Sequence, residues 1–491
     1  MSIAHVILLI IDDVRYDQFF SLMESKHLPN IGKLKKNSFW GKSITTFPSA
    51  TVPAHITIMT GEYQDNYKIP LMNYYDRINR KFKNYSNNLK AFDLFKDMGE
   101  INTLFDMLSE KNTCNVYEPV HRGASYNYPS KFKAIIKYIY YRFFSDLNKS
   151  NENVVKRIIK VFKNPKRFFN HESSITPILT VAWFPATDLI MHNFGSESKE
   201  YLTALQSVDS AIGQLVNELK ELNHLKDTAI VIVSDHGNYS AKELYNPQPF
   251  LASKGLLPLT KKKGDYDMAD GSVLGFYFSG DDNTHFKTKS SLQRYKDQFN
   301  VIEIIKELKG IKWLAYRKDK NTLLKGTIEI TRKINNQWKR GYIHYKNNKT
   351  RYEIEDEDIL GYYRGKKKPD WLDHSKYYSL DEWLSFTHDL DFPIFPDQIL
   401  RNFLNPNSCD LFASSMAEIV YNSVHGTVKK NFHVHAHDVA LKCSMQVPLL
   451  IYHKDFKEKN FKYSKTSDIV PTILTLLDKH IPRSLPGKSI I

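Results

Sequence analysis

Cysteine is scarce in this sequence. The 491 residues include three cysteines, Cys114, Cys409 and Cys443, which lie far apart, and none of them belongs to a CxxC pair. This spacing argues against a disulfide framework and fits a protein of a reducing compartment.

Long hydrophobic runs are also missing near the start of the chain. The first apolar run, residues 6–11 (VILLII), is far shorter than the ~18 residues that a membrane span needs. It leads directly into two aspartates instead of a small-residue cleavage site. The pattern predicts a buried strand rather than a signal peptide, and we expect a cytoplasmic protein.

Acidic residues are fewer than basic ones. The sequence has 54 aspartates and glutamates and 69 lysines and arginines, which gives a net charge of +15. Such a balance helps to attract phosphates. Many lysines lie among asparagines, as in residues 148–157 and 347–351, which is typical of solvated surface. Nucleic-acid binding is therefore disfavoured. The basic and aromatic segment 131–144 predicts either a helix at a membrane surface or a helix that covers the core.

What the sequence does contain is a series of apolar runs of strand length. These runs are residues 5–11, 176–184, 228–234 and 444–452, and the first three lead into acidic residues. Between the second and the third, residues 201–222 carry leucine, isoleucine and valine at helical spacing. Alternating strands and helices predict an α/β fold with a doubly wound, mostly parallel central sheet.

Two stretches interrupt this α/β pattern. We expect the core to comprise residues 1–76, 173–240 and 431–491, with 77–172 a partly inserted basic and aromatic region that retains some core elements, and 241–430 an inserted α+β cap. Within the cap, residues 292–310 are expected to be helical, whereas 312–318 and 326–334 alternate like strands. A cap above the carboxyl edge of the sheet would select the substrate.

Thr51 lies between two prolines just ahead of an apolar run, in the segment TTFPSATVPAHITIMTG. Pro48 and Pro53 each restrict the backbone, so Thr51 is expected in a rigid loop that turns into a helix. A helix N-terminus favours negative charge and suits a hydroxyl that attacks phosphorus and then carries a phosphoryl group. The alternative is a plain N-cap threonine.

Aspartate and histidine gather where the predicted strands end. Asp12 follows the first run, and Asp188 and His192 follow the second at a spacing of four, which places both on one helix face. Asp235 and His236 follow the third run. Carboxylate and imidazole are the ligands that zinc prefers, so the sequence predicts a metal site at this edge of the sheet.

Five segments in this order resemble the alkaline phosphatase superfamily, and most closely its type I phosphodiesterase/nucleotide pyrophosphatase branch. They are LLIIDDVR, FPSATVPAHITIMTG, FPATDLIMHNFG, IVIVSDHG and HDVALKCSMQVPLL. The resemblance covers the predicted core but neither insertion, and it implies an alkaline phosphatase-like fold.

The resemblance also implies a site of two divalent metal ions. Thr51 matches the nucleophile, and the first ion would be held by Asp12, Asp235 and His236 beside the Thr51 oxygen. The ligands of the second ion would be Asp188, His192 and a histidine before the last strand, for which His437 has the expected spacing and His435 and His425 are alternatives. Zinc is favoured by ligand type, and manganese is the other candidate.

Three positions near these motifs carry further expectations. The family commonly follows the last histidine with glycine, whereas His437 is followed by Asp438. Asp13 stands where this branch usually has glycine, so it is either an extra ligand or a cap. Asn73 lies near the position of an amide that donates to a phosphoryl oxygen, although a turn asparagine would account for it equally well.

The function that the resemblance implies is hydrolysis of phosphodiesters through a phosphothreonine intermediate, with a phosphate-ester small molecule as the substrate. A phosphomonoesterase or phosphotransferase of the same superfamily is the alternative, and a non-catalytic binding protein with this fold is a third hypothesis. A sulfatase is disfavoured, because Thr51 cannot become formylglycine and His55 replaces the arginine of the C/S-x-P-x-R element.

Overall fold

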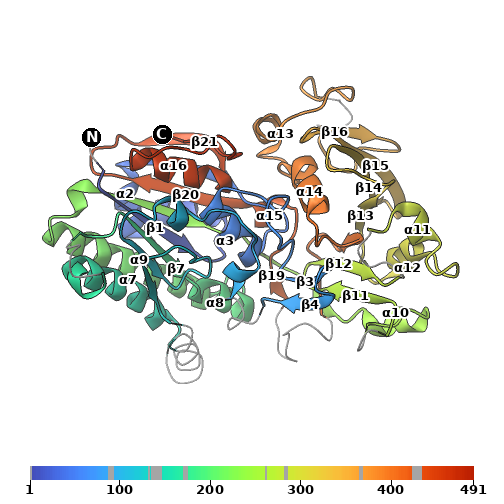
Figure 1. Ribbon diagram of the computed structural model, residues 1–491, viewed down its shortest axis with the longest axis horizontal. Helices are drawn as coiled ribbons and strands as arrows, with labels where there is room; N and C mark the ends of the chain where they lie inside the picture. Colours follow the sequence, from blue (N-terminus) through green and yellow to red (C-terminus); the bar gives the residue numbers. More distant parts are fainter. Residues whose placement is uncertain are drawn as a thin grey trace.

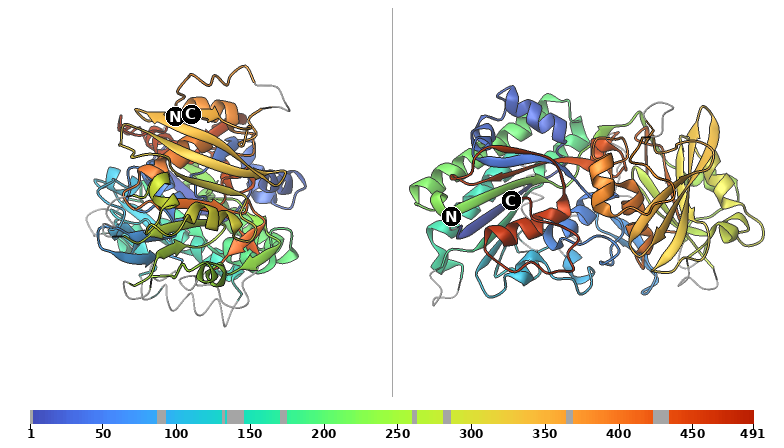
Figure 2. Two further views of the ribbon diagram at one scale, coloured as in Figure 1. Left: turned by 90° about the vertical axis from the view of Figure 1, so that its right-hand side faces the viewer. Right: turned by 90° about the horizontal axis from the view of Figure 1, so that it is seen from above.

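The computed structural model describes residues 3–86, 93–130, 133, 146–169, 175–259, 263–280, 286–363, 369–422 and 434–491. Two parts lie side by side along the longest axis of the molecule (Figures 1 and 2). One part holds an eight-stranded sheet between helices, and the other holds a seven-stranded antiparallel sheet. The predicted α/β fold with an inserted second sheet is confirmed.

The eight-stranded sheet is assembled from strands that lie far apart in the sequence. Its strands, in spatial order, are β21 (Lys459–Lys465), β2 (Ser38–Ile44), β20 (Gln446–Tyr452), β8 (Thr228–Ser234), β1 (His5–Ile11), β7 (Leu179–Phe184), β5 (Thr113–Val116) and β6 (Tyr126–Tyr128). The apolar run of β1 therefore lies in the middle of the sheet, with parallel neighbours on both sides.

One strand departs from the predicted direction. We expected β20 to resemble the other core strands, but it runs antiparallel to both of its neighbours, β2 and β8. Its first residues therefore lie at the edge where the parallel strands end. For this reason the histidines that precede β20 in sequence reach the same edge as the residues that follow β1 and β8.

Both faces of β1 are buried, which explains why its sequence is continuously apolar. Val6, Leu8 and Ile10 pack into one core cluster, whereas Ile7 and Leu9 pack into a second one on the opposite face. The first cluster includes residues of α3 (Thr51–Thr60), α5 (Leu104–Met107) and α16 (Ile469–Leu476). The second includes residues of α1 (Tyr16–Glu24), α2 (Pro29–Lys35), α7 (Asn148–Lys163), α8 (Ala186–Phe194) and α9 (Lys199–Glu221).

Two sequence expectations for helices need correction. Residues 148–157 were expected as solvated surface, but they begin α7, which buries Val154, Val155 and Ile158 against the sheet. The predicted helix over 292–310 is much shorter, because only α12 (Val301–Glu307) is helical after α11 (Lys289–Gln293). The long helix predicted between the second and third strands is confirmed as α9.

The seven-stranded sheet belongs to the inserted part. Its order is β11 (Tyr266–Ala269), β12 (Val273–Phe278), β17 (Leu411–Ser414), β13 (Trp313–Arg317), β14 (Lys325–Ile334), β15 (Gln337–Lys346) and β16 (Lys349–Ile354). The two strands predicted from alternation correspond to β13 and β14. The helices of this part are α10 (Gln248–Ser253), α11, α12, α13 (Leu380–Thr387) and α14 (Phe395–Leu404).

Helix α14 joins this second part to the loop that precedes Thr51. The Oε1 atom of Gln398 accepts hydrogen bonds from Thr46 Oγ1 and Phe47 N, each at 3.0 Å. The Phe47 ring also packs against Phe395 and Trp313. These buried contacts hold the loop before α3 in one conformation.

The remaining described elements are short. They are the strands β3 (Asn73–Asp76), β4 (Lys81–Asn84), β9 (Tyr239–Ser240), β10 (Glu243–Tyr245), β18 (Ile419–Tyr421) and β19 (His435–Ala436), the helix α15 (Lys442–Met445), and the 3-10 helices η1 (Leu94–Lys96), η2 (Pro165–Arg167), η3 (Leu225–Asp227) and η4 (Thr466–Asp468). Across the described ranges, none of the helices combines the length and apolarity that crossing a membrane requires. The candidate membrane-surface segment 131–144 lies, apart from Lys133, outside the described residues. The proposed division of the chain into five segments stays a prediction.

Candidate metal centre and nucleophile

The carboxyl ends of β1, β7 and β8 bring three acidic residues to one edge of the sheet. The register pairs Ile11 of β1 with Phe184 and with Ser234, so these strands end level with one another. Asp12 and Asp235 follow directly, and Asp188 lies in the first turn of α8. Three segments that are far apart in sequence therefore converge, as the sequence predicted.

Thr51 is the first residue of α3 and faces this edge. In the buried stretch 41–61 it is the one residue that is half exposed. Its Oγ1 atom lies 3.2 Å from His236 Nε2. The N-cap position belongs to Ala50, so the alternative interpretation of Thr51 as an N-cap is wrong.

Asp12, Asp235 and His236 form a first group of possible metal ligands. Their ligand atoms all lie within 4.8 Å of one another. His236 Nε2 is 3.2 Å from Asp235 Oδ2 and 3.6 Å from Asp12 Oδ1. All three side chains are buried, and His236 Nε2 also faces the Thr51 hydroxyl.

Asp188, His192 and His437 form a second group beside the first. His192 Nε2 lies 3.2 Å from Asp188 Oδ1 and 3.3 Å from His437 Nε2. The His437 ring stacks on His236 with 4.0 Å between the ring centroids, so the two groups adjoin. His236 and His437 also come together with Asp188 as possible ligands.

The outer nitrogens of two histidines are engaged by hydrogen bonds that orient the rings. His192 Nδ1 donates to the His435 carbonyl at 2.7 Å, and His437 Nδ1 donates to Asp438 Oδ1 at 2.7 Å. With the proton on Nδ1, the Nε2 lone pair of each ring is directed at the cluster, as metal-ligating histidines require.

His435 and His425 were the alternatives to His437 as the last metal ligand. The His435 ring nitrogen Nδ1 contacts Ser240 Oγ at 2.8 Å, and the ring lies against Gly195. Its side chain is therefore directed at β9, whereas its carbonyl orients His192. His425 lies outside the described residues. The geometry favours His437, whose ring stands among the other candidate ligands.

Asp438 occupies a backbone conformation that explains the usual glycine at this position. Its φ is +78°, in the left-handed region that glycine adopts freely and aspartate tolerates better than most residues. The carboxylate compensates for the conformational cost, because it accepts the hydrogen bond from His437.

Asp13 has a similar φ of +60°. Both Asp13 carboxylate oxygens are buried without a hydrogen-bond partner among the described residues, and Oδ1 lies 3.7 Å from His236 Nδ1.

Several other carboxylate oxygens in the cluster are buried without a hydrogen-bond partner in the described part of the chain, namely Asp12 Oδ1, Asp188 Oδ1 and Asp235 Oδ2. Burial, followed by the neighbouring carboxylates of Asp235 and Asp188, raises the pKa of Asp12 well above its usual value. Burying several carboxylates this close together is costly. Divalent cations would neutralise them, so the two groups are consistent with a pair of metal ions.

A buried pair behind the cluster was not predicted. His55 Nδ1 lies 2.7 Å from Glu118 Oε2, and His55 Nε2 lies 3.3 Å from Asp235 Oδ2. Burial disfavours the charged imidazole, but Glu118 and Asp235 outweigh it and raise the pKa of His55 to about 10. Trp183 Nε1 similarly donates to Asp12 Oδ2 at 3.1 Å. No sequence pattern links Glu118 to His55, whereas Trp183 could have been noticed as an aromatic near the end of its strand.

Asn73 begins β3 and is held by the second sheet. Its Nδ2 atom donates to Asp270 Oδ1 at 2.8 Å, and Asp270 N donates to Asn73 Oδ1 at 3.2 Å. The preceding residue, Met72, brings its sulfur within 3.3 Å of the Val52 amide at the start of α3. Asn73 therefore lies one residue from a side chain that touches the helix of Thr51.

Comparison with known proteins agrees with this geometry. The sequence profile described as "Type I phosphodiesterase / nucleotide pyrophosphatase" matches residues 6–352, more than half of the chain. An uncharacterized pyrophosphatase/phosphodiesterase of Schizosaccharomyces pombe is 28% identical over 198 residues, which are 40% of this chain and 37% of that protein. Ectonucleotide pyrophosphatase/phosphodiesterase family member 3 of Mus musculus is 29% identical over 212 residues, 43% of this chain and 22% of that protein. The chain thus spans well under two thirds of the length of these relatives.

Among solved structures, murine ectonucleotide pyrophosphatase/phosphodiesterase 5 has a similar fold. The TM-score is 0.59 at 14% identity, and the match covers 99% of this chain and 97% of the murine chain. The phosphodiesterase and pyrophosphatase hydrolases of this family act on phosphate esters. On the matched profile, the chain belongs to the type I phosphodiesterase/nucleotide pyrophosphatase family.

Proposed function

We propose that this protein is a phosphodiesterase or nucleotide pyrophosphatase that uses Thr51 as its nucleophile and two divalent metal ions as cofactors. The observation that carries the proposal is the 3.2 Å approach of Thr51 Oγ1 to His236 Nε2, within two adjoining sets of Asp and His ligands. Thr51 is half exposed while its neighbours in sequence are buried, so a substrate has access to this one hydroxyl.

The ligands follow from the two groups of side chains. Asp12, Asp235 and His236 would hold one ion, and Asp188, His192 and His437 the other. When bound, such a pair lowers the pKa of a nearby hydroxyl and neutralises charge on the phosphate. Zinc fits the mixture of carboxylate and imidazole, and manganese tolerates it.

The proposed reaction has two steps, and Thr51 carries the phosphate between them. The Thr51 oxygen attacks phosphorus, a Thr51–phosphate ester forms, and the bond from phosphorus to the leaving oxygen breaks. Water then attacks the same phosphorus and releases Thr51. Because α3 begins at Thr51, its N-terminal amides and helix dipole favour the negative charge that the phosphate brings.

The supporting residues keep the reacting groups in position. Gln398 and Phe395 of α14 hold the loop before Thr51, and Glu118 with His55 backs the Asp235 carboxylate. Asn73 already donates one amide hydrogen to Asp270, and its second amide hydrogen would be the donor to a phosphoryl oxygen.

A nucleotide is the substrate class that relatives suggest. An inactive variant of the murine phosphodiesterase 5 has been solved in complex with AMP. That enzyme shares the fold of this chain, and its bound nucleotide is the basis for proposing a nucleotide-containing phosphodiester here.

The test is hydrolysis of bis-p-nitrophenyl phosphate beside p-nitrophenyl phosphate. The protein is first stripped of metal with a chelator and then supplied with Zn²⁺ or Mn²⁺. We expect turnover of the diester that requires added metal and exceeds turnover of the monoester. A preference for the monoester would favour the phosphomonoesterase alternative, and inactivity toward both with metals bound would contradict the proposal.

A further inference from the structure

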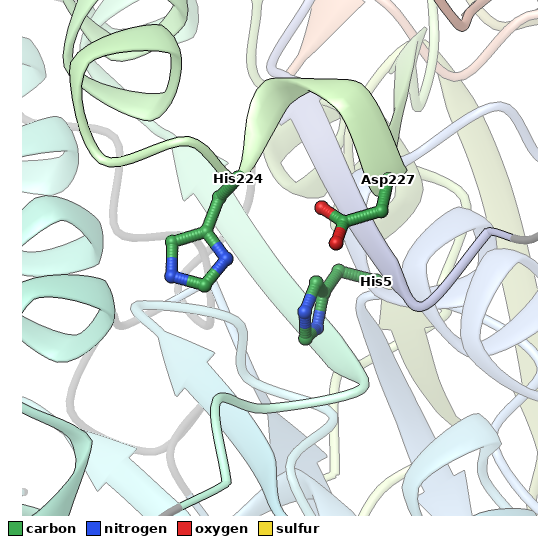
Figure 3. Close-up of side chains that lie close together, drawn as sticks. All are labelled: His5, His224 and Asp227. Carbon is green, nitrogen blue, oxygen red and sulfur yellow. The ribbon is translucent and has the colours of Figure 1, made fainter.

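A third set of metal-ligating side chains lies at the opposite edge of the central sheet. His5 is the first residue of β1, and His224 and Asp227 flank the short turn between α9 and β8. The ligand atoms of these three residues lie within 4.8 Å of one another. Figure 3 shows the Asp227 carboxylate turned toward the two imidazole rings.

This cluster is distinct from the candidate catalytic centre. His5 and Asp12 stand at the two ends of β1, and strands rise ~3.3 Å per residue, so they lie roughly 23 Å apart. The catalytic candidates Asp12 and Asp235 follow β1 and β8, whereas this third set lies where the two strands begin. No residue is shared between the two clusters.

The backbone holds the three residues in place. Ala4 N donates to the Asp227 carbonyl at 2.9 Å, and Thr228 Oγ1 donates to the His224 carbonyl at 2.7 Å. His5 Nδ1 donates to the Pro177 carbonyl at 2.9 Å, which leaves the Nε2 lone pair of His5 to act as a ligand. Burial lowers the pKa of His5, which favours the neutral ring that a metal ligand must be.

The Asp227 carboxylate gives the strongest indication that a cation binds between these three side chains. Its Oδ1 atom is buried and has no hydrogen-bond partner among the described residues. Leaving a buried carboxylate oxygen unsatisfied is costly, and a cation between it and the two imidazoles would remove that cost. His224 and Asp227 are half buried, so the cluster remains accessible from solvent.

We propose that His5, His224 and Asp227 bind a third divalent metal ion, which stabilises the fold and takes no part in catalysis. Two histidines and one carboxylate form a ligand set that zinc accepts, with water in the fourth position. The ion would tie the start of β1 to the turn before β8. These are the two central strands whose other ends carry Asp12 and Asp235.

The test compares zinc binding by the 491-residue chain and by its His224→Asn and Asp227→Asn variants. Each protein is freed of metal, dialysed against a low micromolar concentration of free Zn²⁺, and analysed for zinc per chain by mass spectrometry. Since one ion occupies one site, we expect each variant to bind about one equivalent less than the wild type. Zinc should also raise the Tm of the wild type more than that of either variant.

The matched control is His27→Asn, which removes an exposed histidine outside the cluster. It should bind as much zinc as the wild type. Equal zinc content in the wild type and both cluster variants would overturn the proposal. An equal loss in His27→Asn would overturn it as well, because the binding would then be nonspecific. The comparison is a difference between variants, so it is independent of how many ions the catalytic centre holds.

Discussion

Removal of the Glu118 side chain should destabilise the protein strongly. Glu118 and His55 have no exposed side-chain surface, and their Oε2 and Nδ1 atoms lie 2.7 Å apart. The other oxygen, Oε1, accepts a hydrogen bond from Val120 N at 2.9 Å. Breaking a buried charged pair from one side costs about 3–5 kcal/mol, and His55 would keep only its longer contact with Asp235. In Glu118→Ala the free energy of unfolding should fall by that amount.

The assay is urea denaturation followed by circular dichroism, with Glu118→Gln and Glu152→Ala as comparisons. The glutamine variant retains a hydrogen-bonding group and should lose about 1–3 kcal/mol. Glu152 pairs with Lys156 at 2.8 Å on the exposed face of α7, and such pairs contribute at most about 1 kcal/mol. If Glu118→Ala lost no more stability than Glu152→Ala, the buried pair would not stabilise the fold as we reason.

Three further predictions concern other sites. Asp438→Gly keeps the positive φ but removes the acceptor of His437 Nδ1, so zinc affinity measured by titration should fall roughly 10- to 100-fold. Arg401→Ala leaves the buried Asp397 and the half-buried Asp65 without their ion-pair partner, and urea denaturation should show a loss of about 3–5 kcal/mol. Burial opposes ionisation of Asp381, but Lys465 outweighs it and lowers the pKa of Asp381 below 3.8. Its stabilising effect is therefore present above that pH and lost as the pH falls through the folded-state pKa, and Asp381→Asn should show a shallower loss of stability in acid.

The core of the fold could be predicted because its strands are buried on both faces. The apolar sequences of β1 and β8 are followed directly by Asp and that of β7 by Asp188 in the next helix, and parallel strands bring such endings to one edge. The same logic identified Asp12, Asp188 and Asp235 as neighbours. Thr51 could be singled out because two prolines and an apolar helix surround it in sequence.

Other features depend on contacts between distant segments, which local sequence patterns do not encode. The direction of β20 follows from its pairing with β2 and β8. An apolar run predicts a buried strand but does not indicate whether that strand is parallel or antiparallel to its neighbours. Glu118 reaches His55 across 63 positions of sequence, from a segment that was expected to be partly inserted. Helix α7 was missed because its lysines and asparagines mask a buried stripe of valine and isoleucine.

The most direct test of the proposed mechanism is the rate of metal-dependent hydrolysis of bis-p-nitrophenyl phosphate by Thr51→Ala. The matched control is Thr203→Ala, which changes an exposed threonine on α9 and should leave kcat/KM unchanged. If Thr51 is the nucleophile, its removal should lower kcat/KM by roughly a thousandfold or more while zinc binding by the Asp and His ligands persists. Turnover by Thr51→Ala within about tenfold of the wild type would contradict a Thr51–phosphate intermediate.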